Sequence, residues 1–136
     1  MKHFIPLLIV CGISFLLIAC TKVTRVETNL GSSSIYTEKD MNDAISKILV
    51  EFNSWEDVEM KNIRYAGDEC NSKENVEWMN QLDPGKNYTQ CISFKTDFHT
   101  SKNAKGAWEP DHDYTNYEWY LGRNEGGEWK LLTWGY

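Results

Sequence analysis

The sequence predicts an α+β fold in which a curved antiparallel sheet packs on one main helix near the N-terminal end of the domain. Three observations predict this class. One segment carries apolar residues at helical spacing, three later segments alternate in polarity as strands do, and turn-forming residues separate them. The length of 136 residues predicts a single domain. The hydrophobic share of 41% and the charged share of 25% are those of a globular chain.

An apolar leader precedes the predicted fold. Residues 4–18 form an almost unbroken apolar run, which is short for a bilayer-spanning helix of roughly 20 residues and typical of a signal-peptide core. The run ends in Leu17-Ile18-Ala19-Cys20, which resembles the bacterial lipobox, where the cysteine thiol is acylated and the cysteine becomes the new N-terminus. We expect residues 1–19 to be a lipoprotein signal peptide. An uncleaved membrane helix and cleavage without lipidation are the alternatives.

The lipobox predicts a membrane partner. Two or three acyl chains on Cys20 would hold the protein stably on the outer face of a cell membrane, because one chain binds only marginally. Residues 20–35 are predicted to be the lipidated cysteine and a flexible tether, since they include the run Gly31-Ser32-Ser33-Ser34. Residues 36–136 remain as the single α+β domain.

The main helix is predicted from Thr37 to Phe52. Thr37 is a favourable N-cap, and the acidic residues Glu38 and Asp40 suit the first turn. Its apolar residues recur at helical spacing, and we expect them to cover the sheet: Met41, Ala44, Ile45, Ile48, Leu49 and Phe52.

Two short elements follow the helix. Residues 58–66 alternate as a strand, but the alternation shifts by one at Asn62, which suggests a bulge. Ser72 is then a suitable cap for a short helix that ends at Leu82, before a turn at residues 83–87.

The C-terminal half is predicted to hold three longer strands. Residues 88–98 alternate clearly, and a polar loop occupies residues 99–113. Residues 114–123 and 128–134 then form two strands, and the glycine-containing segment 124–127 joins them as a hairpin turn.

Two cysteines remain in the predicted exported domain. Cys70 and Cys91 form an even pair, which in an exported domain indicates a disulfide. Free thiols are the alternative, and the absence of a Cys-x-x-Cys motif argues against a redox-active pair.

The C-terminal strands carry a family resemblance. The segments at residues 114–123 and 127–136, with Gly127-Glu128-Trp129-Lys130-Leu131, resemble uncharacterised exported and lipoprotein domains of Gram-positive bacteria. They are also similar to the final strands of the NTF2-like (cystatin-like) superfamily. This resemblance implies a cone-shaped sheet around a helix, with a pocket, and implies no assigned activity. The predicted helix is shorter than the usual NTF2-like opening helix, so we expect a shallow pocket.

Two polar clusters are candidates for chemistry. Asp97 and His99 lie two residues apart on a strand and could serve as a general base inside a cone. Asp111, His112 and Asp113 have residue types that bind Ca²⁺ or Zn²⁺, although the EF-hand pattern is missing. A solvent-exposed strand end and a solvated turn are the alternatives.

The aromatic residues near the C-terminus suggest a binding surface. Tyr117, Trp119 and Trp134 could form a stacking platform for a sugar or a peptide, or else the core of a small sheet. The net charge of −6 argues against a nucleic-acid partner.

The leading hypothesis is therefore a non-catalytic, lipid-anchored cell-surface domain that binds a small ligand or an envelope protein, without a cofactor. The alternatives are an NTF2-like enzyme that uses Asp97 and His99 and a structural or inhibitory surface protein.

Overall fold

The computed structural model describes residues 25–136 and has an α+β architecture with a five-stranded mixed sheet. Residues 1–19 and Cys20, predicted to be the signal peptide and the lipidation site, lie outside the described residues. Within residues 25–136, no helix is both long and apolar enough to cross a membrane. In chain order the elements are β1 (Glu27–Asn29), α1 (Glu38–Phe52), β2 (Val58–Tyr65), the 3₁₀ helix η1 (Asp68–Asn71), α2 (Lys73–Leu82), β3 (Gln90–Thr100), β4 (Asp113–Arg123) and β5 (Lys130–Gly135).

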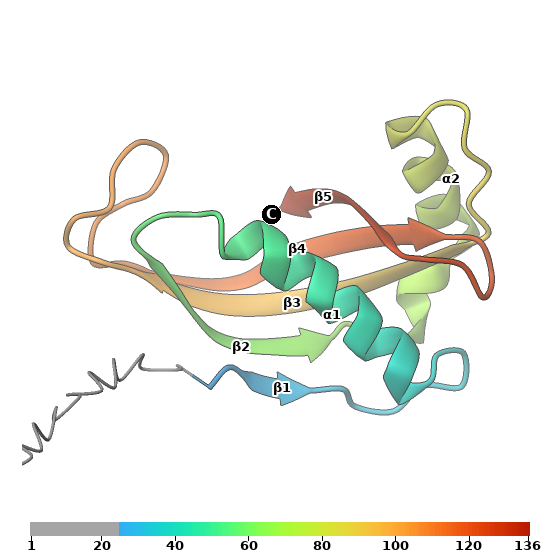
Figure 1. The fold of residues 1–136 in the computed structure, drawn as a ribbon, viewed down its shortest axis with the longest axis horizontal. Coiled ribbons are helices and arrows are strands. Elements are labelled where there is room, and N and C mark those ends of the chain that lie inside the picture. Colours follow the sequence, from blue (N-terminus) through green and yellow to red (C-terminus); the bar gives the residue numbers. More distant parts are fainter. Residues whose placement is uncertain (1–24) are drawn as a thin grey trace, which may run out of the picture.

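The strands lie in the sheet in the order in which they occur in the chain, from β1 to β5 (Figure 1). Strands β2 to β5 pair antiparallel, as predicted, but β1 pairs parallel to β2, with Thr28 opposite Ile63. The prediction of a wholly antiparallel sheet was therefore wrong at this edge. The reason is that α1 connects β1 to β2, and a helical crossover returns the chain in its original direction.

The predicted tether is partly folded. Of residues 20–35, those from 25 onward are described, and they include β1. Val26 and Leu30 pack against the core. Asp68 accepts hydrogen bonds from Ser33 Oγ (2.5 Å) and from the Ser34 backbone N–H (2.8 Å). The domain therefore begins before residue 36.

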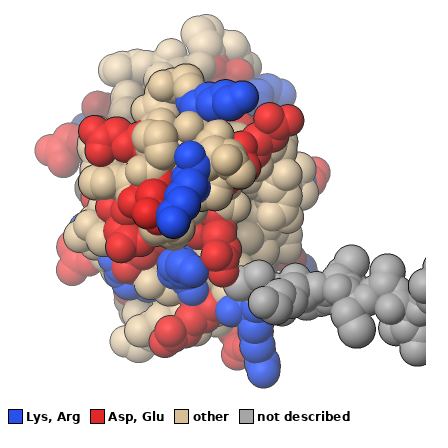
Figure 2. Space-filling model, turned by 90° about the vertical axis from the view of Figure 1, so that its left-hand side faces the viewer, with Lys and Arg blue, Asp and Glu red and all other residues tan. Residues whose placement is uncertain are grey.

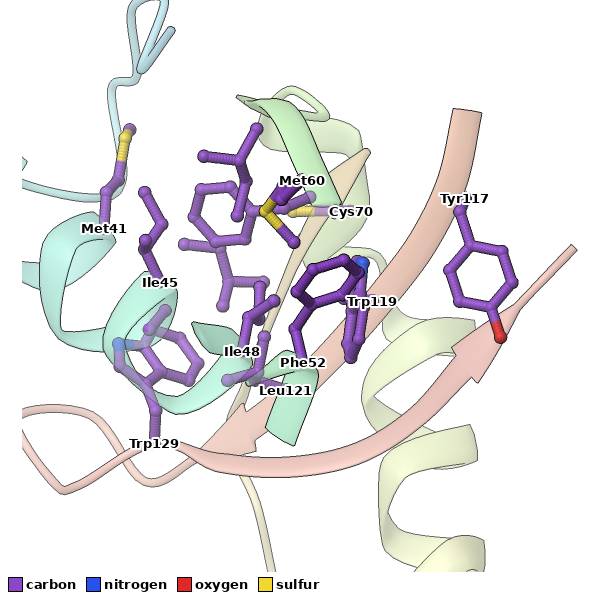
Figure 3. Close-up of a cluster of buried hydrophobic side chains, with 14 of the residues drawn as sticks. Met41, Ile45, Ile48, Phe52, Met60, Cys70, Tyr117, Trp119, Leu121 and Trp129 are labelled. Carbon is purple, nitrogen blue, oxygen red and sulfur yellow. The ribbon is translucent and has the colours of Figure 1, made fainter. Parts of the chain in front are cut away.

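Helix α1 lies across one face of the sheet and supplies much of the core (Figures 1 and 3). It starts with a reciprocal capping box between Thr37 and Asp40. The predicted apolar face is buried at five positions, and Leu49 is partly buried: the buried residues are Met41, Ala44, Ile45, Ile48 and Phe52. Trp119 and Leu121 of β4 lie opposite this face and are fully buried.

The other face of the sheet is partly covered by α2. Met79 of this helix packs with Tyr88 and Cys91. Cys91 and Ile92 are neighbours on β3, so their side chains point to opposite faces, and Ile92 belongs to the core under α1. The sheet is therefore packed on both faces at the α2 end.

The cysteine pair forms no disulfide in the structure. Cys70 and Cys91 are both buried, free thiols. The Cys70 sulfur lies 3.7 Å from the backbone oxygen of Cys91. The reason is that the Cys70 side chain packs in the core under α1, whereas Cys91 points to the α2 face.

The sheet changes register twice around Asp97. Pairing of β2 with β3 slips between Met60 and Asn62, so the irregularity predicted at Asn62 is present. Pairing of β3 with β4 slips between Thr96 and Phe98. Such bulges raise the local twist of a sheet.

Candidate functional site

A groove follows strand β5 and is the candidate binding site. Its volume is about 760 Å³, which lies within the range of small-molecule pockets. One wall consists of the α1 residues Lys47, Val50 and Glu51. The remaining lining comes from β5 and from the two loops beside it: Lys86, Tyr88, Asn124, Gly127, Glu128, Trp129, Lys130, Leu131 and Trp134. We call this space the β5 groove.

The β5 groove lies at the edge of the sheet. Val50 is on α1, which covers one face, whereas Tyr88 packs with Met79 of α2 on the opposite face. Residues from both faces can line one groove only where the sheet ends. Strand β5 is that end, since among residues 25–136 the only strand that pairs with it is β4.

Apolar surface is exposed along the β5 groove. Val50 is 75% exposed although it lies on a helix whose other apolar residues are mostly buried. Trp134 is 39% exposed. Trp129 has a buried ring whose Nε1 donates to the backbone oxygen of Asp40 at 3.0 Å, and this bond fixes β5 to the start of α1.

The charges along the β5 groove are nearly balanced. The groove lining contains three lysines and two glutamates, and two of the lysines are paired with carboxylates. Lys47 on α1 forms an ion pair with Glu128 before β5. Lys130 lies 2.8 Å from Asp83, and this hydrogen bond, together with one from Tyr88, lowers the pKa of Asp83.

Of the three aromatic residues predicted to form a stacking platform, only Trp134 lines the β5 groove. Trp119 is fully buried, and its Nε1 donates to Thr96 Oγ1 at 2.9 Å. Tyr117 is also buried. Trp134 stacks on Trp119 with ring centroids 5.7 Å apart, and Trp55 stacks on the same ring at 5.3 Å. The alternative of an aromatic core therefore holds for Trp119 and Tyr117.

Asp97 is held in a polar network on the sheet. Its carboxylate accepts hydrogen bonds from the Asn62 side chain (2.9 Å) and from the Asn116 backbone N–H (2.9 Å), and it pairs with Arg64 (3.1 Å). Partial burial raises the pKa of Asp97, but these hydrogen bonds outweigh it and lower the pKa below the ordinary value. A carboxylate with this many donors is a poor general base.

His99 lies between two other carboxylates. Nδ1 is 2.7 Å from Asp113 and Nε2 is 3.1 Å from Asp111. The hydrogen bond that His99 donates to Asp113 is the main cause that raises the pKa of His99. Among residues 25–136 no hydrogen bond joins Asp97 to His99. The structure thus gives each residue separate partners, and neither lines the β5 groove.

The residues predicted to bind a metal do not converge. His112 Nδ1 lies 3.4 Å from Glu109, whereas Asp111 and Asp113 contact His99. In the part of the chain that the structure describes, no group of three or more histidine, cysteine, aspartate or glutamate residues is arranged to hold a metal ion. Figure 2 shows the end of the molecule that holds the β3–β4 loop, where acidic side chains are mixed with basic ones.

Most residues of the β5 groove are not recognisable as site residues from the sequence. Lys47, Val50 and Lys130 were predicted only as parts of a helix or strand. Val50 offered a signal, because it is an apolar residue outside the helical stripe that covers the sheet.

Comparisons with known proteins found no relative of this chain. No protein-family model matches the chain, and neither a curated protein nor a solved structure shows significant similarity to it.

Proposed function

We propose that the protein is a non-catalytic domain, lipid-anchored to the outer face of a cell membrane, that binds a ligand or an envelope partner in the β5 groove. The observation that carries the binding role is the exposure of Val50 and Trp134, which both line a groove of about 760 Å³. Pockets of this size with apolar walls and a few polar groups are typical ligand sites.

The anchor is supported by the sequence around Cys20. An apolar run of signal-peptide length ends in Leu17-Ile18-Ala19-Cys20. Since β1 begins at Glu27, only residues 21–26 would lie between the lipid and the sheet. An extended chain spans at most about 3.6 Å per residue, so this linker would reach roughly 20 Å. The anchored domain would therefore stay close to the bilayer.

The non-catalytic role is supported by the separation of the polar candidates. Asp97 is engaged with Arg64 and Asn116, and His99 with Asp111 and Asp113. Acid–base catalysis needs a group within hydrogen-bond reach of a bound substrate, and neither residue lines the β5 groove.

The NTF2-like cone is also a proposal. A main helix across one face of a five-stranded sheet is compatible with it. An experimental structure that superimposes on an NTF2-like domain over both helix and sheet would support this assignment, and one with different connectivity would reject it.

The anchor is tested by labelling cells with a radioactive fatty acid. The wild-type chain should incorporate label and partition into detergent, and the Cys20→Ala variant should do neither. Equal labelling of the two chains would contradict lipidation of Cys20.

The groove is tested by a thermal-shift screen of the full-length protein in detergent against sugars, peptides and small anions. A ligand at about 100 times its Kd should stabilise the fold by roughly 2.7 kcal/mol. The variant Trp134→Ala should lose this shift. A ligand that stabilises both proteins equally would show that it binds elsewhere.

A further inference from the structure

Most charged side chains of the β5 groove are held in pairs. Lys47 forms an ion pair with Glu128, and Lys130 lies 2.8 Å from a carboxylate before β3. The two charged lining residues that remain, Lys86 and Glu51, have opposite signs. The groove therefore offers no excess of charge to a ligand. This balance favours a neutral ligand, because a charge that leaves water without a partner is costly to bury.

The groove also contains an exposed indole that is fixed in place. Trp134 is 39% exposed and lines the groove, and its ring stacks on the buried Trp119 ring with centroids 5.7 Å apart. Because this stack holds the Trp134 ring, little conformational freedom is lost when a ligand packs against it. The face of an aromatic ring is electron-rich and attracts weakly positive C–H groups, such as those on the face of a sugar ring.

Polar groups suited to hydroxyls lie along the same groove. The Asn124 amide and the Lys86 ammonium line it, and within residues 25–136 neither forms a side-chain hydrogen bond or an ion pair. An amide donates and accepts hydrogen bonds, and an ammonium donates them, so both can bind hydroxyl groups. Lys130 and Trp134 lie four residues apart on β5 and both line the groove, which gives it a length of roughly 13 Å along the strand. This length accommodates more than one sugar ring.

We propose that the β5 groove binds a neutral oligosaccharide, with one sugar ring packed on Trp134 and hydroxyl groups hydrogen-bonded to the polar lining. This inference rests on the proposed function and names its ligand class. A neutral oligosaccharide has apolar C–H faces and a rim of uncharged hydroxyls. These match a lining that combines the exposed apolar side chains of Val50 and Trp134 with polar groups of balanced charge.

The test uses the full-length protein in a detergent without a sugar headgroup, so that the detergent does not compete for the groove. The probes are neutral tetrasaccharides of glucose, mannose, galactose and N-acetylglucosamine, each titrated by isothermal calorimetry. We expect saturable binding of at least one probe, with an affinity that changes little with salt, because salt screens only interactions between charges. If none of the four tetrasaccharides binds, the inference is overturned.

Charged derivatives of the probe that binds test the role of charge. One derivative carries carboxylates in place of the primary hydroxyl groups, and the other carries ammonium groups at the C2 positions. Each should bind at least about tenfold more weakly than the neutral tetrasaccharide, a difference of about 1.4 kcal/mol, because the groove has no excess of opposite charge. A charged derivative that binds more tightly than the neutral probe would overturn the inference.

A matched pair of tryptophan variants tests the contact with Trp134. Trp134→Leu keeps an apolar side chain but removes the flat ring, and Trp78→Leu makes the same change on α2, outside the groove. The two indoles are 39% and 37% exposed, so neither change empties the core. Trp134→Leu should weaken binding at least about tenfold, whereas Trp78→Leu should leave it unchanged. Trp134→Phe keeps a flat ring and should bind more tightly than Trp134→Leu, and thermal denaturation checks that each variant is folded.

The outcomes separate this inference from the proposed function. If a peptide or a small anion stabilises the wild type but not Trp134→Ala while all four neutral tetrasaccharides fail to bind, the groove function stands and the sugar inference falls. If a tetrasaccharide binds equally to the wild type and to Trp134→Leu, it binds elsewhere and the inference also falls. If neither a tetrasaccharide nor any screened ligand binds, both proposals fail.

Discussion

Asp40 on the first turn of α1 accepts a hydrogen bond from Arg123 at the end of β4, at a distance of 2.8 Å. Its other carboxylate oxygen accepts from the backbone N–H of Thr37 at 2.9 Å, so one side chain both caps α1 and joins it to the sheet. Arg123 is buried, and its guanidinium lies over the Trp129 ring at 4.2 Å. This contact fixes the start of the helix that forms one wall of the β5 groove.

The first prediction concerns this ion pair. The variant Asp40→Asn leaves the Arg123 charge without its carboxylate partner, and we expect a loss of about 2–3 kcal/mol in the free energy of unfolding. Asp43→Asn is the control on the same helix, since the Lys39–Asp43 pair is exposed and such pairs contribute little. Chemical denaturation measures both. Equal stability of the two variants would contradict a structural role for the pair.

The pH dependence of the same pair follows from its pKa. The hydrogen bond from Arg123 lowers the pKa of Asp40 to about 2. A carboxylate whose pKa is lower in the folded than in the unfolded state stabilises the fold above the unfolded value of about 4, and this stabilisation is lost as the pH falls toward 2. When the pH is lowered from about 5 to about 2, the free energy of unfolding of the Asp40→Asn variant should therefore fall less than that of the wild type.

Local patterns in the sequence predicted α1 well, because its cap and its buried stripe are set by residues within one element. They failed at β1, whose three residues are all exposed and therefore show no alternation. They also failed at the β5 groove, because a sheet edge depends on which strands pair. Trp119 and Trp134 lie opposite each other in the β4–β5 register, yet one is buried and the other exposed. Trp119 is on the inner strand β4 and packs against Phe52 and Trp55, whereas Trp134 is on the edge strand β5.

The second prediction separates these two tryptophans. Trp119→Ala should cost about 3–5 kcal/mol of folding free energy, because it removes a fully buried ring. Trp134→Ala should lower the free energy of unfolding by only about 1 kcal/mol, since the Trp134 ring is partly exposed. The same variant should abolish ligand binding in the β5 groove. Thermal denaturation and the ligand screen measure the two effects. A Trp134→Ala variant that binds with full affinity would remove Trp134 from the site.

The third prediction concerns the two buried thiols. Burial raises the pKa of Cys91 to about 12 and also raises that of Cys70, so both thiols stay protonated and react slowly. In the folded protein, Cys70 and Cys91 should be alkylated slowly by iodoacetamide at pH 8, a pH below both raised pKa values, as peptide mass spectrometry would show. In denaturant both thiols should react at once. An intact mass lower by two hydrogens, with neither thiol reactive in denaturant, would instead establish the disulfide that the sequence predicts.

The last prediction concerns the two carboxylates that contact the His99 ring. Its ring lies between Asp113 at 2.7 Å and Asp111 at 3.1 Å, and Glu59 lies opposite it on β2. The hydrogen bond that His99 donates to Asp113 raises the pKa of His99 above its ordinary value. A histidine with a raised folded pKa stabilises the fold fully below the unfolded value of about 6.5, and this stabilisation is lost as the pH rises through the folded pKa.

Titration of the His99 ring by NMR checks whether these carboxylates contact it in solution. The wild type should titrate above the ordinary histidine value, and Asp113→Asn should lower the pKa, because it removes the main stabilising carboxylate. Glu109→Gln is the control, since Glu109 pairs with His112 and not with His99. If the Asp113→Asn and Glu109→Gln variants give the same His99 titration as the wild type, Asp113 does not hold the ring in solution. In that case this contact does not hold the start of β4 to β3.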